Sequence, residues 1–332
     1  MNDPGVMHCI SWNGEPRLWY GGNTASRVGP IHAAYRGLRR FWDRHQRLPI
    51  PASVQIAIDM TRAWAEGPIE GWVVIIGANS PYRKIICMPH GLNARPLLVG
   101  KIPLAVHAWA SIQREAETLL ALAQRTSSIV ITPRLLGLVP GRASFQSAIT
   151  GRYGRLNPST LGTAWLELLA ADVSLPSRQE AIRMRLCTLQ CLALQPGWDA
   201  ALRPLIELGE RLLEHPRLGS IPWGRAHRDL IGANTVRSGH QIGVCDWEHS
   251  DGNWSPLCDL LHEQALRTHW SPRLRLPAAV SRSDAQLLLD LHLLDTGSLY
   301  LYSANASGLS WMAGRCPLFL HSATKRMRRE NE

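Results

Sequence analysis

Two neighbouring stretches decide the fold expected for this chain: residues 227–234, His-Arg-Asp-Leu-Ile-Gly-Ala-Asn, and residues 242–248, Ile-Gly-Val-Cys-Asp-Trp-Glu. In the first stretch, Asn234 follows Asp229 by five positions. A turn, Arg-Ser-Gly-His, then leads into a short apolar strand that ends at Asp246. This order predicts a loop that aims three polar side chains at one point from a rigid base.

These residue types at this spacing are typical of the catalytic loop of a kinase. Asp229 is expected to orient the attacking hydroxyl and to accept its proton. Asn234 and Asp246 are expected to bind Mg²⁺, because hard cations prefer oxygen ligands. The alternative is a chance match, with an ordinary surface turn after the strand. The joint spacing favours phosphoryl transfer, with Asp229, Asn234 and Asp246 as the catalytic residues.

The same residues resemble the aminoglycoside phosphotransferase and choline kinase-like family, relatives of the protein kinases. Members carry a motif near H-G-D-x-x-x-x-N, then a strand followed by I-D-W-E or I-D-F-E, and a later P-x-x-D-L that residues 256–260 match. The chain departs at Arg228, where the family usually has glycine, and at Gly232-Ala233, where Pro-Trp is common. Neither change removes a group that the reaction needs.

The resemblance covers roughly residues 70–265. It implies an α+β, two-lobed protein-kinase-like fold, with a small antiparallel sheet lobe that carries one key helix, and a larger, mainly helical lobe. We expect three parts: an N-terminal extension at 1–70, docked on or part of the small lobe; a nucleotide-binding lobe at 71–150; and a helical lobe at 151–332 with the catalytic loop and the acceptor site.

Apolar periodicity agrees with this division. Residues 52–105 are expected to form strands, three of them joined as an antiparallel meander. After Pro158, apolar residues recur at three- and four-residue spacing, which is typical of helices, and Pro204 is expected in the first turn of its helix. The expected strands of the meander are 72–76, 85–88 and 96–101, and the expected helices are 161–171, 178–194, 200–214, 257–266 and 284–294.

A kinase small lobe needs a lysine for the α- and β-phosphates and a glutamate that pairs with it. Lys101 closes the third expected strand, and Glu115 lies on the apolar stripe of an expected helix at 108–122. Lys84, which opens its strand, competes with Lys101. Glu117 competes with Glu115, but it lies about 200° round the helix, so only one can face the lysine. We expect the pair Lys101–Glu115; an exposed strand-end lysine is the alternative.

Two further strands are expected, at 128–133 and 143–149. The resemblance implies that the second runs into the hinge between the lobes, where the adenine binds. It therefore places Gln146, Ser147 and Ile149 at the nucleotide base, with an edge strand and loop as the alternative.

Further residues around the expected site have structural or ligand-binding roles. The turn 77–81 either covers phosphates or is a plain hairpin turn. His227 and Asp259 are expected to brace the catalytic loop. Glu248 either assists a second metal or faces the substrate. Arg228 either contacts a phosphate or an acidic substrate group, or faces solvent.

Composition excludes several classes of protein. No run of 18 apolar residues occurs and no secretion signal begins the chain, so we expect a cytoplasmic protein without a membrane span. The seven cysteines form no C-x-x-C, which favours free thiols. His262-Glu263 begins like a zinc-protease motif, but Leu266 stands where the second histidine is needed.

A net charge of +10 favours anionic partners and argues against a polycationic substrate such as an aminoglycoside. The basic segment 33–47 is either a peripheral contact for an anionic lipid surface or phosphate, or a helix docked on the small lobe. We therefore predict a kinase that uses ATP and Mg²⁺ to phosphorylate a hydroxyl of a small metabolite, such as a sugar or an amino alcohol. The alternative is an inactive kinase-like protein that binds a nucleotide or a protein partner. Nucleic acid is not an expected partner, and the sequence fixes neither the acceptor nor the oligomeric state.

Overall fold

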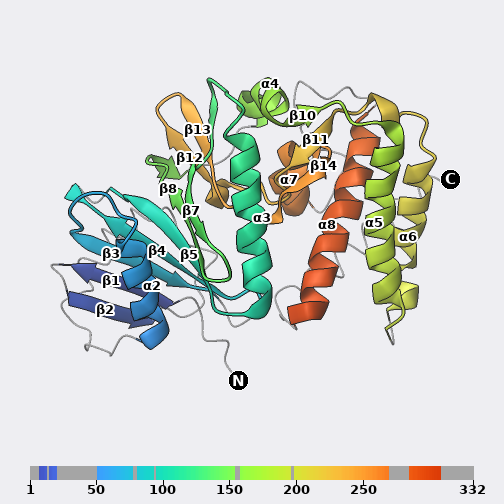
Figure 1. Ribbon diagram of the computed structural model, residues 1–332. Coiled ribbons are helices and arrows are strands. Elements are labelled where there is room, and N and C mark those ends of the chain that lie inside the picture. Colours follow the sequence, from blue (N-terminus) through green and yellow to red (C-terminus); the bar gives the residue numbers. More distant parts are fainter. Residues whose placement is uncertain are drawn as a thin grey trace. The chain divides into compact units, whose positions relative to one another are not determined.

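The computed structural model describes the backbone of the segments drawn in colour in Figure 1. These segments are 7–12, 15–20, 51–77, 81–92, 95–153, 158–195, 198–268 and 284–307; side chains are described in all of them except at 7–20, 153, 158–160, 266–268 and 303–307. The basic segment 33–47 and turn residues 78–80 lie outside the described residues, so the expectations for them stay predictions.

The chain divides into two compact units. The first consists of Met1–Arg155 together with Gly232–Glu248, and the second of Leu156–Ile231 together with His249–Glu332. The hairpin after the catalytic loop thus belongs to the first unit, whereas Asp229 belongs to the second. The domain boundaries at 70 and 150 stay a prediction.

The first unit contains a seven-stranded antiparallel sheet (Figure 1). The meander expected from the sequence is present at its centre as β3-β4-β5. Strands β1 and β2 pair with each other and β1 pairs with β3, so residues 7–12 and 15–20 are part of the same sheet. In spatial order the strands are β2 (Glu15–Tyr20), β1 (Met7–Trp12), β3 (Gly71–Ile76), β4 (Lys84–His90), β5 (Leu98–Pro103), β8 (Ala143–Ser147) and β7 (Leu135–Val139).

Residues Ala52–Arg62 form a helix, α2, so the expectation of strands throughout 52–105 is wrong at this point. Val54, Ala57 and Ile58 are buried at three- and four-residue spacing, which places them on one helix face. Helix α2 packs on the sheet (Figure 1). Its buried face contributes to a core that includes Trp72 and Phe145. The helical period of the apolar residues therefore decides the structure of this segment.

The other face of the sheet carries the polar residues of interest. Lys101 lies opposite Ile86 on β4 and opposite Ser144 on β8. It lies inside β5 instead of closing the strand, because β5 runs two residues beyond it to Pro103. The helix α3 (Val106–Leu122) follows and packs against β5, β7 and β8.

A second, four-stranded sheet completes the first unit. The strand expected at 128–133 is confined to β6 (Val130–Ile131), which pairs in parallel with β13 (Gln241–Val244). The hairpin partner of β13 is β12 (Thr235–Ser238), which also pairs with β9 (Arg152–Tyr153). This sheet anchors the hairpin that ends at Asp246.

The second unit is mainly helical, as predicted. Helices α5, α6 and α8 contact one another side by side, and α7 packs against α4 and α8 (Figure 1). A small sheet, β10 (Ala170–Ala171), β11 (Trp223–Ala226) and β14 (Asp251–Trp254), leads into the catalytic loop. The helices are α4 (Pro158–Leu169), α5 (Leu175–Ala193), α6 (Asp199–Leu213), α7 (Leu257–Thr268) and α8 (Ala285–Ser307).

Two details of these helices differ from expectation. Pro204 lies inside α6 beyond its first turn, because the helix begins at Asp199. A proline there removes one hydrogen bond of the helix, in contrast to a proline at the first position. Helix α8 continues well past residue 294.

None of the helices in the described segments is long and apolar enough to cross a membrane.

Gly209 on α6 allows the close approach of α5 and α8, and this gives a testable prediction. A Cβ at this position would lie 2.4 Å from Leu186 Cδ2, 2.9 Å from Leu186 Cγ and 3.2 Å from Leu294 Cδ1. We expect Gly209→Ala to lower the free energy of unfolding by about 1–3 kcal/mol through overpacking. Urea denaturation measures this change.

Gly162 on α4 is the matched control, because a Cβ there would meet nothing within 4 Å. Gly162→Ala should raise the free energy of unfolding by up to about 1 kcal/mol, the gain in helix propensity. Equal stabilisation by the two variants would contradict the close packing at Gly209.

Candidate active site

A buried lysine connects the sheet, helix α3 and the hairpin of the first unit. Lys101 Nζ lies 2.7 Å from Glu115 Oε2 and 2.7 Å from Asp246 Oδ1. The ion pair predicted between Lys101 and Glu115 is therefore present, and Asp246 is its third member. Glu117 is exposed on α3 and accepts a hydrogen bond from Gln113 instead.

The charge of Lys101 is maintained by its partners. Burial by itself would lower the pKa of this lysine, but the carboxylates of Asp246, Glu115 and Glu248 outweigh burial and raise the pKa well above its ordinary value. Lys101 is therefore an ammonium ion at neutral pH, the form that binds phosphate oxygens.

The second lysine considered from the sequence also reaches this cluster. Lys84 Nζ is bonded to Glu248 Oε2 and lies 3.9 Å from Asp246 Oδ1. The two lysines are therefore neighbours and not alternatives. Glu248 has a protein partner that the sequence did not suggest, because 164 positions separate it from Lys84.

The hairpin β12-β13 brings Asn234 and Asp246 to the same end. Thr235 pairs with Val244, and just beyond this pair Cys245 N donates a hydrogen bond to Asn234 O at 3.0 Å. Asp246, the next residue, has a positive φ of 66°, a conformation that aspartate tolerates better than most residues. Trp247 N donates to Glu115 Oε1 at 3.2 Å and fixes the chain on the far side of Asp246.

The chemistry of these donors fits Mg²⁺. Asp246 offers a carboxylate and Asn234 an amide oxygen, and Mg²⁺ in nucleotide sites usually binds one or two carboxylates together with phosphates and water. The described segments contain no group of three or more His, Cys, Asp or Glu residues that could hold a metal by itself. Binding of Mg²⁺ by Asn234 and Asp246 stays a prediction.

The three residues expected at the nucleotide base lie at the end of β8 and just beyond it. Gln146 is opposite Val99 and shares the sheet face of Lys101; it is 3% exposed, and its Oε1 has no hydrogen-bond partner among the described residues. Ser147 Oγ accepts a hydrogen bond from Arg134 N at 2.8 Å. Ile149 packs against Gly243, where a Cβ would lie 2.5 Å from Ile149 Cγ2. Their contact with a nucleotide stays a prediction.

In the second unit, the loop that carries Asp229 is braced by Asp259, as predicted. Asp259 accepts hydrogen bonds from His227 N at 2.8 Å, Arg228 N at 2.7 Å and Trp165 Nε1 at 3.2 Å. Burial raises the pKa of Asp259 to about 7, and the two backbone donors oppose this shift. The bracing role of His227 is also confirmed, since its Nδ1 accepts a hydrogen bond from Asp229 N at 3.2 Å.

The carboxylate of Asp229 has a partner that sequence reasoning missed. His262 Nε2 on α7 lies 3.5 Å from Asp229 Oδ1, and His262 Nδ1 lies 3.1 Å from His292 Nε2 on α8. Burial would raise the pKa of Asp229, but the hydrogen bond and charge of His262 lower it overall. At His262 the only sequence signal is an incomplete zinc-protease pattern, and the contact of His262 with Asp229 depends on how α7 packs.

The three-dimensional comparison identifies the architecture. An ADP-bound aminoglycoside phosphotransferase, APH(2'')-Ib, aligns with a TM-score of 0.55 at 12% identity, over 82% of this chain and 98% of that chain. An aminoglycoside phosphotransferase in complex with GDP and kanamycin aligns with a TM-score of 0.56 at 12% identity, over 83% and 99%. Macrolide 2'-phosphotransferase type I aligns with a TM-score of 0.53 at 12% identity, over 82% and 97%.

The chain has a protein-kinase-like fold. The predicted fold class is therefore confirmed. At this level of identity the likeness establishes the fold alone. The sequence matches no family profile and no curated protein.

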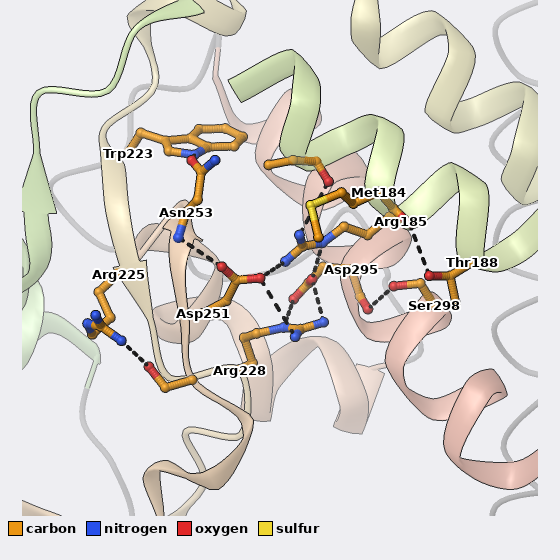
Figure 2. Close-up of polar contacts among 12 residues, drawn as sticks. Met184, Arg185, Thr188, Trp223, Arg225, Arg228, Asp251, Asn253, Asp295 and Ser298 are labelled. Carbon is orange, nitrogen blue, oxygen red and sulfur yellow. Dashed lines mark hydrogen bonds and ion pairs between the residues drawn. The ribbon is translucent and has the colours of Figure 1, made fainter. Parts of the chain in front are cut away.

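Within this kinase-like fold, Arg228 is the main departure from the resembled motif. Its guanidinium forms a bidentate ion pair with Asp295 on α8, with Nε–Oδ2 at 2.9 Å and Nη2–Oδ1 at 2.8 Å. Arg185 on α5 joins the network through Asp295 at 3.0 Å and Asp251 at 2.6 Å (Figure 2). The solvent-facing alternative for Arg228 is therefore wrong.

The network explains how an arginine is accommodated where the family usually has glycine. Arg228 has a φ of 70°, in the left-handed region that favours glycine. Burial would raise the pKa of Asp295, but Arg228 and Arg185 lower it, so that the carboxylate is ionised and binds both guanidinium groups. The ion pairs offset the backbone strain and connect the catalytic loop to α5 and α8.

This balance predicts the effect of restoring the glycine of the resembled motif. Removing one partner of a buried ion pair costs about 3–5 kcal/mol. Relief of a left-handed backbone returns only about 1–2 kcal/mol. We therefore expect Arg228→Gly to lower the free energy of unfolding, as measured by urea denaturation.

Arg183 provides the control, since its ion pair with Glu180 is exposed on α5. Arg183→Ala should change the free energy of unfolding by no more than about 0.5 kcal/mol. A gain in stability in the Arg228→Gly variant would show that strain, and not the ion-pair network, dominates at this position.

Proposed function

We propose that the protein is a small-molecule kinase that uses ATP and Mg²⁺ to phosphorylate a hydroxyl group. The observation that carries the proposal is the contact of Lys101 with both Glu115 and Asp246 in a kinase-like fold. A buried ammonium between a helix glutamate and the acid after the hairpin is the arrangement that kinases use for phosphate binding.

Each candidate site residue of the first unit has a distinct role in this proposal. Lys101 binds the phosphates that are not transferred, and Glu115 orients it. Asn234 and Asp246 bind Mg²⁺, which neutralises the charge that develops on the transferred group. Gln146, Ser147 and Ile149 lie at the nucleotide base, where the unpaired Gln146 Oε1 supports a contact with a polar ligand.

Asp229 acts on the acceptor. Its carboxylate accepts a hydrogen bond from the substrate hydroxyl and keeps the oxygen in line with the phosphorus. It takes the proton as the new P–O bond forms and the bond from the γ-phosphorus to the β,γ-bridging oxygen breaks, which releases ADP. The transition state of phosphoryl transfer is loose, so positioning supplies much of the catalysis. The lowered pKa of Asp229 supports this role, because it keeps the carboxylate of Asp229 ionised at neutral pH.

The acceptor is proposed as a small hydroxylated metabolite. The structural neighbours are aminoglycoside and macrolide phosphotransferases, some of them with ADP or GDP bound. For this chain, the net charge of +10 argues against a polycationic aminoglycoside. A neutral or anionic sugar or alcohol agrees better with that charge, and a screen of ATP consumption over such compounds would identify it.

The metal role of Asp246 gives the first test of the proposal. Asp246→Ala should lower the rate of ATP turnover in the presence of Mg²⁺ by about 100-fold or more, because one preorganised charged group contributes that much to catalysis. It should also remove the dependence of ATP affinity on Mg²⁺ in calorimetric titrations. Asp59→Ala, an exposed change on α2, is the control and should alter neither quantity.

The role of Asp229 is tested separately, because it acts on the acceptor. Asp229→Asn should keep ATP affinity within about twofold and lower transfer by about 10²–10⁴-fold, the usual contribution of a general base. Phosphorylated product is measured in a single turnover. Asp199→Asn, an exposed change on α6, serves as the control. Normal transfer in Asp229→Asn would remove this residue from the mechanism.

A further inference from the structure

Lysine is rare in this protein, and its distribution is informative. The chain has 36 Lys and Arg residues, yet lysine occurs only at positions 84, 101 and 325. Two of the three, Lys84 and Lys101, reach the same carboxylate, Asp246. At Asp295, a buried carboxylate, the protein uses arginine instead.

The strand register places the two lysines on one face of the sheet. Ile86 lies opposite Lys101, and Lys84 is two residues before Ile86 on β4. Residues opposite one another, and residues two apart on a strand, point to the same side. Both lysine side chains therefore point to the sheet face that also carries Gln146. Lys84 Nζ lies 3.9 Å and Lys101 Nζ 2.7 Å from Asp246 Oδ1.

Each lysine has its own glutamate. Lys101 pairs with Glu115, and Lys84 pairs with Glu248. The backbone of Glu248 is in turn connected to α3, because Arg114 Nη1 donates a hydrogen bond to Glu248 O at 3.3 Å. The side chain of Lys84 is only 12% exposed, so this ammonium is withdrawn from bulk water.

The chemical difference between lysine and arginine suggests why lysine occurs here. An ammonium is a compact charge on a flexible stem with three rotatable donors, whereas a guanidinium is a planar fork suited to one fixed carboxylate. When Asp246 binds a metal ion, it is less available to the two ammonium groups. A bound metal would thus leave ammonium donors of Lys84 and Lys101 available for other anionic oxygens.

We propose that Lys84 is a second phosphate-binding residue, held by Glu248 as Lys101 is held by Glu115. Its ligand is the polyphosphate group of a nucleotide. The proposal rests on the proposed kinase function. A kinase site needs one lysine for the phosphates, and the proposal assigns the same task to a second lysine. The competing explanation is that Lys84 only neutralises Glu248.

Calorimetric titration with ATP, ADP and adenosine in the presence of Mg²⁺ tests the proposal. Lys84→Met should weaken ATP binding by about tenfold to 100-fold, the loss expected for hydrogen bonds to a charged group. Adenosine, which has no phosphate, should bind within twofold of its affinity for the unaltered protein. Unchanged ATP affinity, or an equal loss for adenosine, would overturn the proposal.

A double variant separates phosphate binding from neutralisation of Glu248. If Lys84 only neutralises Glu248, Lys84→Met combined with Glu248→Gln removes both charges and should restore ATP affinity. If Lys84 binds phosphate, the double variant should stay at least tenfold weaker than Glu248→Gln alone. Thermal unfolding without ligand checks that each variant folds, and Lys84→Gln replaces Lys84→Met if the latter does not.

Two further variants complete the design. Arg142→Met removes one positive charge at an exposed turn of the first unit and should leave ATP affinity unchanged. Lys101→Met tests the kinase proposal itself. Loss of ATP binding in Lys101→Met but not in Lys84→Met would reject the role of Lys84 alone, whereas no ATP binding by the unaltered protein would reject the kinase function.

Discussion

The first unit depends on the burial of one ammonium ion. An ammonium withdrawn from water is stable only where carboxylates replace its hydration. Lys101 Nζ lies 2.7 Å from a carboxylate oxygen of Glu115 and 2.7 Å from one of Asp246. These partners come from α3 and from the end of the β12-β13 hairpin, 14 and 145 positions away in the chain. The same contacts that satisfy the lysine therefore fix the sheet, the helix and the hairpin relative to one another within this unit.

The second unit follows the same electrostatic rule with different groups. Asp259 is buried beneath the catalytic loop and accepts two of its backbone N–H groups, so the path of the loop is determined by a side chain on α7. Arg228 then ties the loop to Asp295 on α8, in spite of an unfavourable backbone conformation. Because unpaired buried charges are costly, each of these contacts restricts the loop to one conformation.

The sequence predicted those features whose signal is local or comes from a spaced motif. The spacing of Asp229, Asn234 and Asp246 predicts their roles, which stay predictions, and the apolar stripe on its helix predicts that Glu115 pairs with Lys101. The prediction of strands from residue 52 onward is wrong for α2. The apolar stripe of this helix is short, and the run of β-branched residues that indicates a strand begins only later, at 73–76. The partners of Arg228, Lys84 and Asp229 could not be predicted, since they lie 67, 164 and 33 positions away and depend on tertiary packing.

The two kinds of cation in this protein suggest a division of tasks. In the second unit, Arg185 and Arg228 share Asp295 through several parallel hydrogen bonds, a geometry that suits a permanent structural contact. In the first unit, Lys84 and Lys101 share Asp246 through single contacts of a mobile ammonium group. A carboxylate that must leave its protein partner for a metal ion is better paired with such a group than with a rigid guanidinium fork. Lysine near Asp246 and arginine near Asp295 thus agree with the proposal that only the contacts of Asp246 are exchanged for a metal ion.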